Sequence, residues 1–295
     1  MNIKKKYKST ISLLLFIAPF FLTFCVFMLY PLSKGIVLSF TDWNGISADM
    51  TFVGLKNYIE VFTKDTRFLN SLKVTGIYTI CIVVLSNIFG LLLAIFIEKS
   101  GKIKNTLRTL FFIPYVLSLV VVGFTWKLMY TKVAANLYQI TGLGLFDIDF
   151  LGNADIALLS VILMSIWQGI GYYMLIYIAG LQSIDTAIIE AADIDGASEG
   201  KKFFRIKLPL LMPSLTICIF TSIADSLKVF DAVFVLTSGG PGYATETIAI
   251  NIYNEAFGSA NLYGYGMAKA VVLAVIILIV SVVQLGYFKG KEVEM

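Results

Sequence analysis

Histidine is absent from this 295-residue sequence, and charged residues make up only 14% of it. Without histidine, the chain has no imidazole for acid–base catalysis, for metal ligation or for a proton relay. The low charge excludes an ordinary soluble domain, in which about 25% of residues are charged. We therefore expect a membrane protein.

Cysteine is also scarce, and the nucleotide-binding P-loop is missing. The three cysteines stand alone inside apolar runs, without a CxxC pair: Cys25, Cys81 and Cys218. This placement is typical of small packing residues. Because no GxxxxGK[ST] string occurs, we expect no nucleotide and no other cofactor on this chain.

Apolar residues are abundant, since 58% of the chain is hydrophobic and its mean hydropathy is +0.85. Uncharged runs of about 18 or more residues predict membrane-spanning helices. Six such runs predict an all-α membrane protein with six transmembrane helices: Ser9–Ser33, Val74–Ile97, Thr109–Trp126, Ile156–Ile184, Leu208–Ala224 and Ala270–Phe288. The fifth run is short and spans only if Asp225 and Lys228 lie within its helix. The first run is too long for a signal peptide and no small-x-small cleavage site follows it, so we expect it to be a retained span.

The basic residues are distributed unevenly among the predicted loops. Fourteen of the 23 lie in four regions: Lys4, Lys5, Lys6, Lys8; Lys99, Lys102, Lys104, Arg108; Lys201, Lys202, Arg205, Lys207; and Lys289, Lys291. The positive-inside rule places these regions in the cytoplasm. We therefore expect a cytoplasmic tail at 1–8, a six-span domain at 9–288 and a cytoplasmic tail at 289–295. The net charge of +4 is then a topology signal, and we expect no nucleic-acid partner.

The longest polar interruption on this side is Glu190–Pro209. Its Ala-rich start predicts a short helix that ends at Gly196, where glycine can take a positive φ. The following SEGKKFFRIK predicts a second short helix with an apolar face, which includes Phe203 and Phe204, and a basic face. Such a pair of helices suits docking to a partner or to acidic headgroups.

The fourth apolar run is unusually rich in polar and aromatic side chains. Ser165, Gln168 and Tyr172 share one helical face with Gly169. Aromatic rings beside amide and hydroxyl groups suit a neutral sugar, whose C–H faces stack and whose hydroxyls bond. An aromatic belt with interhelical bonding is the alternative, particularly for Tyr173 and Tyr177.

The fifth run carries Ser222, Asp225 and Ser226 on one face. An ionisable residue within a span is a candidate functional residue. A structural pair between Asp225 and Lys228 is an equally open interpretation. The candidate substrate path therefore contains Ser165, Gln168, Tyr172, Ser222, Asp225 and Ser226.

The predicted external segments carry weaker signals. Leu55–Phe62 has helical apolar spacing, with a packed surface loop as the alternative, and 246–258 predicts a short amphipathic helix. A loop is expected from about Lys127 to Asp155. Its aspartates lack the spacing of a calcium loop, so we expect a solvated acidic surface and no metal site: Asp147, Asp149 and Asp155.

Two stretches resemble a known family. EAA at 190–192, followed by Gly196 and by Ile206-x-Leu208-Pro209, is similar to the EAA loop of ABC-importer permeases. The string KVFDAVFVLTSGGPGYATETIAINIYNEAF, at 228–257, resembles the region before the last span in carbohydrate-importer permeases of the maltose, lactose and glycerol-3-phosphate type. The chain lacks the extra N-terminal spans and the large insertion of the bigger maltose-type subunit.

The resemblance implies the ABC type I importer permease fold in a bacterial cell membrane, with a coupling loop at 186–207. It implies a non-catalytic subunit that works with a second, related permease, an ABC ATPase dimer that carries ATP and Mg²⁺, and an extracellular sugar-binding protein, all at the lipid bilayer. The implied ATPase-coupling residues are Glu190, Ala191, Ala192, Asp195, Gly196, Ala197, Phe203, Phe204, Ile206, Leu208 and Pro209.

Two other functions remain open at this point. An ion-gradient-driven secondary transporter would favour an inverted repeat and a membrane carboxylate such as Asp225. A membrane-embedded enzyme would need a nucleophile and a base among the spans. For an importer, a di- or oligosaccharide is the favoured substrate, and a polyol phosphate stays open. The lack of an Arg/Lys cluster within the spans disfavours a phosphorylated ligand.

Overall fold

The structure is a computed structural model that describes residues 3–47, 49–98, 101–258 and 262–289. Within them the chain is helical almost throughout, as expected for an all-α membrane protein. The chain divides into two compact units, one of residues 1–64 with 252–272 and one of residues 65–251 with 273–295. The tail residues 1–2 and 290–295, including Lys291, lie outside the described residues.

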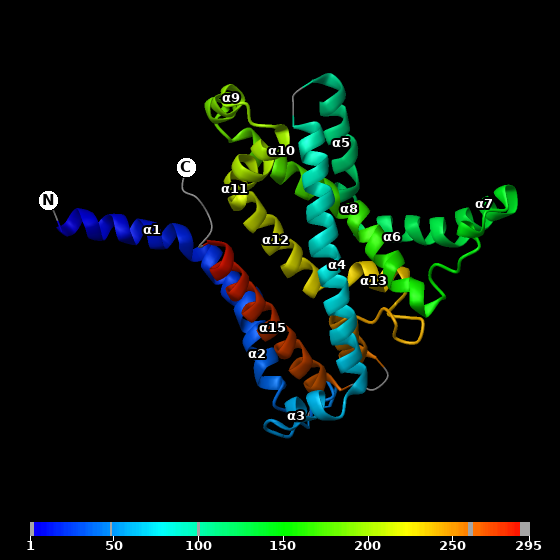
Figure 1. Cartoon of the computed structure of the whole chain (residues 1–295). Helices are drawn as coiled ribbons and strands as arrows, with labels where there is room; N and C mark the ends of the chain where they lie inside the picture. Colours follow the sequence, from blue (N-terminus) through cyan, green and yellow to red (C-terminus); the bar gives the residue numbers. More distant parts are fainter. Residues whose placement is uncertain (1–2, 48, 99–100, 259–261, 290–295) are drawn as a thin grey trace. The chain divides into compact units, whose positions relative to one another are not determined.

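The first unit begins with one continuous helical segment, drawn in blue in Figure 1, that changes direction between its two ends. It comprises α1 (Ile3–Phe24), a π-helical turn (Cys25–Leu29) and α2 (Tyr30–Leu38). The apolar span lies at Leu15–Leu38, so the predicted end at Ser33 is wrong. Pro31 does not end the helix because it stands in the first turn after the π-helical turn, where its missing N–H is tolerated.

Polar contacts join the rest of this unit. α3 (Lys56–Thr63) confirms the predicted surface helix. Its buried Asn57 donates hydrogen bonds to the carbonyls of Ser39 and Thr41, at 2.9 and 2.8 Å. Near the start of α15 (Tyr263–Lys289), the buried Lys269 ammonium lies 2.7 Å from the carboxylate of Glu255. Glu255 belongs to α14 (Ile248–Phe257), which confirms the second predicted surface helix.

The second unit is built around α4 (Thr66–Ile97) and α8 (Ala154–Gln182), which pack along each other. Asp65 and Asn153 cap their N-termini, each through a side-chain oxygen that accepts a backbone N–H. A Cβ on Gly90 of α4 would meet the Cβ of Tyr173 at 2.9 Å. This close approach explains why glycine is suited to the crossing.

The third and fifth predicted spans both belong to bent pairs of helices. α5 (Lys102–Val116) and α6 (Leu119–Leu128) meet at 96°, and a π-helical turn (Met129–Val133) and α7 (Ala134–Thr141) extend the second arm. The loop predicted from Lys127 is therefore helical as far as Thr141. The segment Glu199–Leu210 and α12 (Met212–Leu227) meet at 67°. Counting each bent pair once, the described residues hold up to six spans.

The remaining elements are short. They are a 3₁₀ turn (Gly144–Phe146), α9 (Thr186–Ile194), α10 (Glu199–Lys202), a π-helical turn (Phe203–Lys207), α11 (Leu208–Leu210) and α13 (Asp231–Leu236). The C-terminal end of α4 lies at the same end of this unit as α9 and α10 (Figure 1). Two apolar clusters fill the unit, one around Met164 and Val233 and the other around Ile97, Tyr177 and Leu211.

Candidate functional site

A polar cavity of about 380 Å³ lies among the helices of the second unit. α4 contributes Tyr78, Ile82 and Ser86, while the α5–α6 bend contributes Tyr115 and Leu119. α8 contributes Ser165, Gln168, Gly169 and Tyr173, and α12 with the residues after it contributes Ser222, Asp225, Ser226 and 228–232. The volume is in the range of small-ligand sites, and tyrosines, hydroxyls and one amide are mixed in the wall.

Five of the six predicted substrate-path residues line this cavity: Ser165, Gln168, Ser222, Asp225 and Ser226. Tyr172 does not. Its ring stacks on that of Tyr115, with centroids 4.8 Å apart, so it lies behind a lining residue. The neighbouring Tyr173, which the sequence assigned more readily to an aromatic belt, lines the cavity instead.

Three of the four lining serines are bonded within their own helices. Ser165 donates to the carbonyl of Val161, at 2.9 Å, and Ser226 donates to that of Ile223, at 3.1 Å. Ser222 donates to the carbonyl of Ile219, at 3.0 Å, and accepts from Asn87, at 3.2 Å. Their hydrogen atoms are occupied, so the serines offer acceptor lone pairs to a ligand.

Ser86 differs from these serines. It is buried, it lines the cavity, and its hydroxyl has no hydrogen-bond partner among the described residues. A buried hydroxyl without a partner costs free energy, which a ligand or water can recover. The sequence shows Ser86 only as one polar residue in a span, because its place opposite α8 and α12 depends on packing.

Charge in the cavity comes from Asp225, Lys228 and Asp231. The Lys228 ammonium lies 3.1 Å from the Asp225 carboxylate, and both side chains are more than half exposed. The pair predicted as a structural alternative therefore exists, but it faces open space. The carboxylates retain acceptor capacity toward sugar hydroxyls.

The second candidate site is the coupling loop, defined here as residues 186–207 with the following Leu208 and Pro209. α9 begins after Asp185, whose side chain accepts the N–H of Ala187 at 2.9 Å. It ends in a turn at Gly196, whose φ is +72°. The predicted pattern of helix, glycine turn and second short helix is confirmed.

Lys202 connects the two parts of the coupling loop. Its buried ammonium donates to Asp193 of α9, at 2.6 Å, and to Glu199 at the start of α10. The Asp193 carboxylate, followed by that of Glu199, holds the pKa of Lys202 above its ordinary value. Lys202 thus stays charged at neutral pH and holds α9 to α10.

The predicted coupling residues fall into three groups by exposure. Glu190, Ala191, Asp195, Gly196 and Phe204 are exposed, Ala192 is buried, and Ala197, Phe203, Ile206, Leu208 and Pro209 are half-buried. The most exposed large apolar side chains of the loop are Ile194, at 87%, and Phe204, at 68% exposure, and Ile188 is exposed at 41%. Exposed apolar side chains on polar helices are typical of a docking surface.

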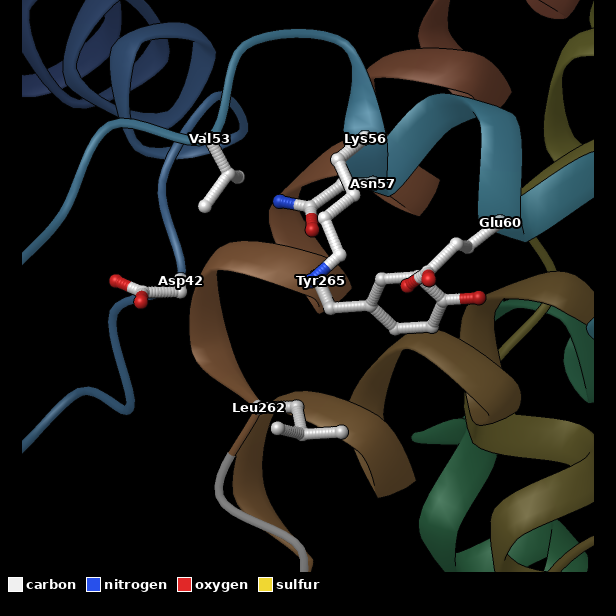
Figure 2. Close-up of a pocket in the computed structure, with 7 residues that line it drawn as sticks. All are labelled: Asp42, Val53, Lys56, Asn57, Glu60, Leu262 and Tyr265. Atoms are coloured by element: carbon white, nitrogen blue, oxygen red, sulfur yellow. The ribbon is translucent and has the colours of Figure 1, made fainter.

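A smaller pocket, of about 210 Å³, lies in the first unit. Figure 2 shows Lys56, Asn57 and Glu60 reaching into it from α3, with Leu262 and Tyr265 below and Asp42 to one side. Its carboxylates are engaged locally. Thr51 donates to Asp42 and holds the pKa of that carboxyl below its ordinary value, and Lys64 does the same for Glu60. This pocket contains none of the predicted path residues.

No group of three or more Cys, Asp or Glu residues that suits a metal ion occurs in the described part of the chain. The two sites therefore combine a polar cavity among membrane-spanning helices with an exposed pair of short helices at one end of the same unit. This arrangement defines a multi-span membrane transport subunit.

Comparison with known proteins identifies the family. Residues 86–288 match the model of the binding-protein-dependent transport system inner membrane component, and the chain belongs to this family. It is 37% identical, over 291 residues, to the probable starch degradation products transport system permease protein AmyD of Thermoanaerobacterium thermosulfurigenes, which covers 99% of this chain and 98% of that protein. It is 34% identical to the multiple sugar-binding transport system permease protein MsmF of Streptococcus mutans, over 91% of this chain and 92% of that protein.

The fold is shared with a solved bacterial ABC transporter that imports the acidic polysaccharide alginate. One chain of that structure superposes with a TM-score of 0.83 at 21% identity, over 97% of this chain and 98% of that chain. The resemblance to carbohydrate ABC-importer permeases is thus confirmed, together with the all-α permease fold. The protein is a multi-pass inner-membrane permease subunit.

Proposed function

We propose that this permease passes a di- or oligosaccharide across the membrane through the polar cavity of its second unit. The observation that carries the proposal is the wall of that cavity, where Tyr78, Tyr115 and Tyr173 face Gln168 and Asp225. Tyrosine rings stack on sugar C–H faces, while the amide and carboxylate bond to hydroxyls. The relatives named for starch degradation products and multiple sugars support the same substrate class.

The energy for transport is proposed to come from a separate ABC ATPase dimer that binds ATP and Mg²⁺ and docks on the coupling loop. Support comes from two exposed apolar side chains of the coupling loop, Ile194 and Phe204, and from the exposed Glu190, which lies one turn before Ile194 in α9. Apolar anchors and a charge on one loop suit a cleft with an apolar floor and a basic rim. Closure of the ATPase would then move the coupling loop and switch access to the cavity.

Three further partners complete the proposal. Many large apolar side chains of the first helical segment are exposed, Phe16, Phe20 and Phe27 among them, and suit the bilayer or a second permease. A solved relative of the fold is described in complex with a periplasmic protein bound to an alginate pentasaccharide. We infer that an extracellular binding protein delivers sugar here too. The Lys/Arg bias supports a cytoplasmic location for both termini and the coupling loop.

Co-purification from mild detergent, followed by mass spectrometry, tests this assembly. The tagged chain should bring down an ABC ATPase and a second permease. The double variant Glu190→Arg with Phe204→Asp should lose the ATPase, while Ile140→Asp, at an exposed position of α7 outside the coupling loop, should retain it. Recovery of the chain alone would support the ion-gradient alternative instead, for which the family match provides no support.

A further inference from the structure

Glu98 follows the last residue of α4 and joins four segments of the second unit. Its carboxylate accepts from the Lys207 ammonium, at 3.0 and 3.4 Å. Its backbone carbonyl accepts from Arg108 of α5, at 2.9 Å, and from Gln182 at the end of α8, at 3.2 Å. Arg108 also donates to the carbonyl of Ile97, at 2.9 Å. The C-terminal ends of α4 and α8 and the middle of α5 thus converge on one residue that also binds the coupling loop.

Lys207 and Glu98 are set in partly dry surroundings. Their side chains are only 20% and 21% exposed. They line a cavity of about 280 Å³ with Glu190 and with the apolar Leu181, Ile184 and Ile189. An ion pair in such surroundings is screened less than a surface pair, and loss of one partner leaves the other poorly solvated. The pair therefore links the coupling loop more firmly than an exposed pair would.

The position of Lys207 along the chain gives the pair a mechanical role. Lys207 precedes the break at Leu211, where the helical direction changes by 67° before α12. A bend of this kind weakens the transmission of movement from the coupling loop along the backbone. The Lys207–Glu98 ion pair connects the coupling loop directly to the end of α4, and Lys207 comes before this bend in the chain. Ser86, in the cavity wall, lies twelve positions back along α4, or about 18 Å from Glu98 at 1.5 Å per residue.

We propose that Glu98 is a positioning residue that transmits movement of the coupling loop to α4 and α8, and so to the substrate cavity. This inference rests on the proposed function of the coupling loop. It assigns to the Lys207–Glu98 pair a role in the yield of transport per ATP, separate from the docking of the ATPase through Glu190 and Phe204.

The test uses the whole transporter in proteoliposomes, with the ATPase, the second permease and the sugar-loaded binding protein. Sugar uptake and ATP hydrolysis are measured on the same sample. We expect Glu98→Gln and Lys207→Gln each to retain the ATPase but to lower uptake per ATP by about tenfold. Glu98→Asp keeps the carboxylate and should lower the uptake per ATP less than Glu98→Gln does. The reversed pair, Glu98→Lys with Lys207→Glu, should recover most of the yield. Glu60→Gln, which breaks an exposed pair with Lys64, is the matched control.

Each outcome bears on a separate part of the account. Absence of ATP-dependent uptake in the unaltered complex refutes the importer itself. ATP-driven uptake with an unchanged yield in Glu98→Gln and Lys207→Gln overturns the positioning role alone. Loss of the ATPase from both single variants would assign the pair to assembly and would also overturn it. If the single variants lower the uptake per ATP and the reversed pair does not restore it, the ion pair is not what connects the coupling loop to α4.

Discussion

At the scale of single residues, one ion pair of the second unit joins the part-exposed Arg67 to the fully buried Glu246. The guanidinium donates to both carboxylate oxygens, at 2.8 and 2.5 Å, and Glu246 is fully buried. The same guanidinium lies over the ring of Tyr243, 4.2 Å from its centroid. These contacts hold the segment before α14 against the start of α4. The adjacent Thr247 donates to the carbonyl of the cavity-lining Val229, at 2.9 Å, and so ties this segment to the cavity wall.

Replacement of Arg67 tests this support. Arg67→Met should lower the free energy of unfolding by about 3 kcal/mol, because a buried carboxylate loses its charged partner. Unfolding of the detergent-purified chain, followed by circular dichroism, measures the loss. Lys64→Met breaks only the exposed pair with Glu60 and should cost less than about 1 kcal/mol. An equal loss of unfolding free energy in Arg67→Met and Lys64→Met would contradict the support assigned to the Arg67–Glu246 pair.

Gln168 tests the proposed substrate path. Gln168→Leu removes an amide from the cavity wall and should lower sugar uptake about tenfold at limiting sugar, since about 1.4 kcal/mol of hydrogen bonding is lost. Thr221→Val removes a hydroxyl of α12 that is bonded to its own helix and is outside the cavity wall, so uptake should be unchanged. Equal uptake in both variants would leave Gln168 as a packing residue.

At the scale of elements, glycines set how closely the helices approach. A Cβ on Gly171 of α8 would overlap the backbone carbonyl of Phe111 in α5. Gly171→Ala should therefore separate α5 from α8 and lower stability by about 2 kcal/mol, with reduced transport. Gly76→Ala in α4 meets no atom within 4 Å and should be neutral or slightly stabilising. Thermal unfolding that ranks the two in the opposite order would contradict this packing.

Gly196 sets the geometry of the coupling loop through its backbone alone. A Cβ there would meet nothing within 4 Å, so only the positive φ opposes substitution. We expect coupled ATP hydrolysis to fall in the order Gly196→Asn, Gly196→Ala, Gly196→Pro, because asparagine tolerates this conformation and proline cannot adopt it. Membrane insertion should be unchanged in all three. Full activity of Gly196→Pro would show that the turn is dispensable.

At the scale of the whole molecule, the sequence predicts the spans better than their ends. The fourth run is uncharged for its whole length, and α8 matches it closely. α4 begins at Thr66, eight residues before the predicted run, because Arg67 and Lys73 are compatible with a helix that extends beyond the bilayer. The helical path through Lys127 and Lys132 was missed for the same reason.

The two candidate sites also differ in how much of each the sequence predicts. The coupling loop was predictable because its turn and its amphipathic pattern are local in sequence. On the cavity wall, Gln168 was found from one helical face, whereas Ser86 and Tyr173 depend on how α4, α8 and α12 pack. Glu98 and Lys207 are 109 positions apart, so no local pattern links them. Contacts of this kind follow from tertiary packing alone.

The most direct test of the central claim is sugar uptake by proteoliposomes that contain this permease with its ATPase and second permease. The account predicts uptake that requires internal ATP and the external binding protein, and that persists when ionophores remove every ion gradient. Glu190→Arg with Phe204→Asp should abolish it. Uptake by this chain alone, driven by an imposed ion gradient and lost in Asp225→Asn, would contradict the claim.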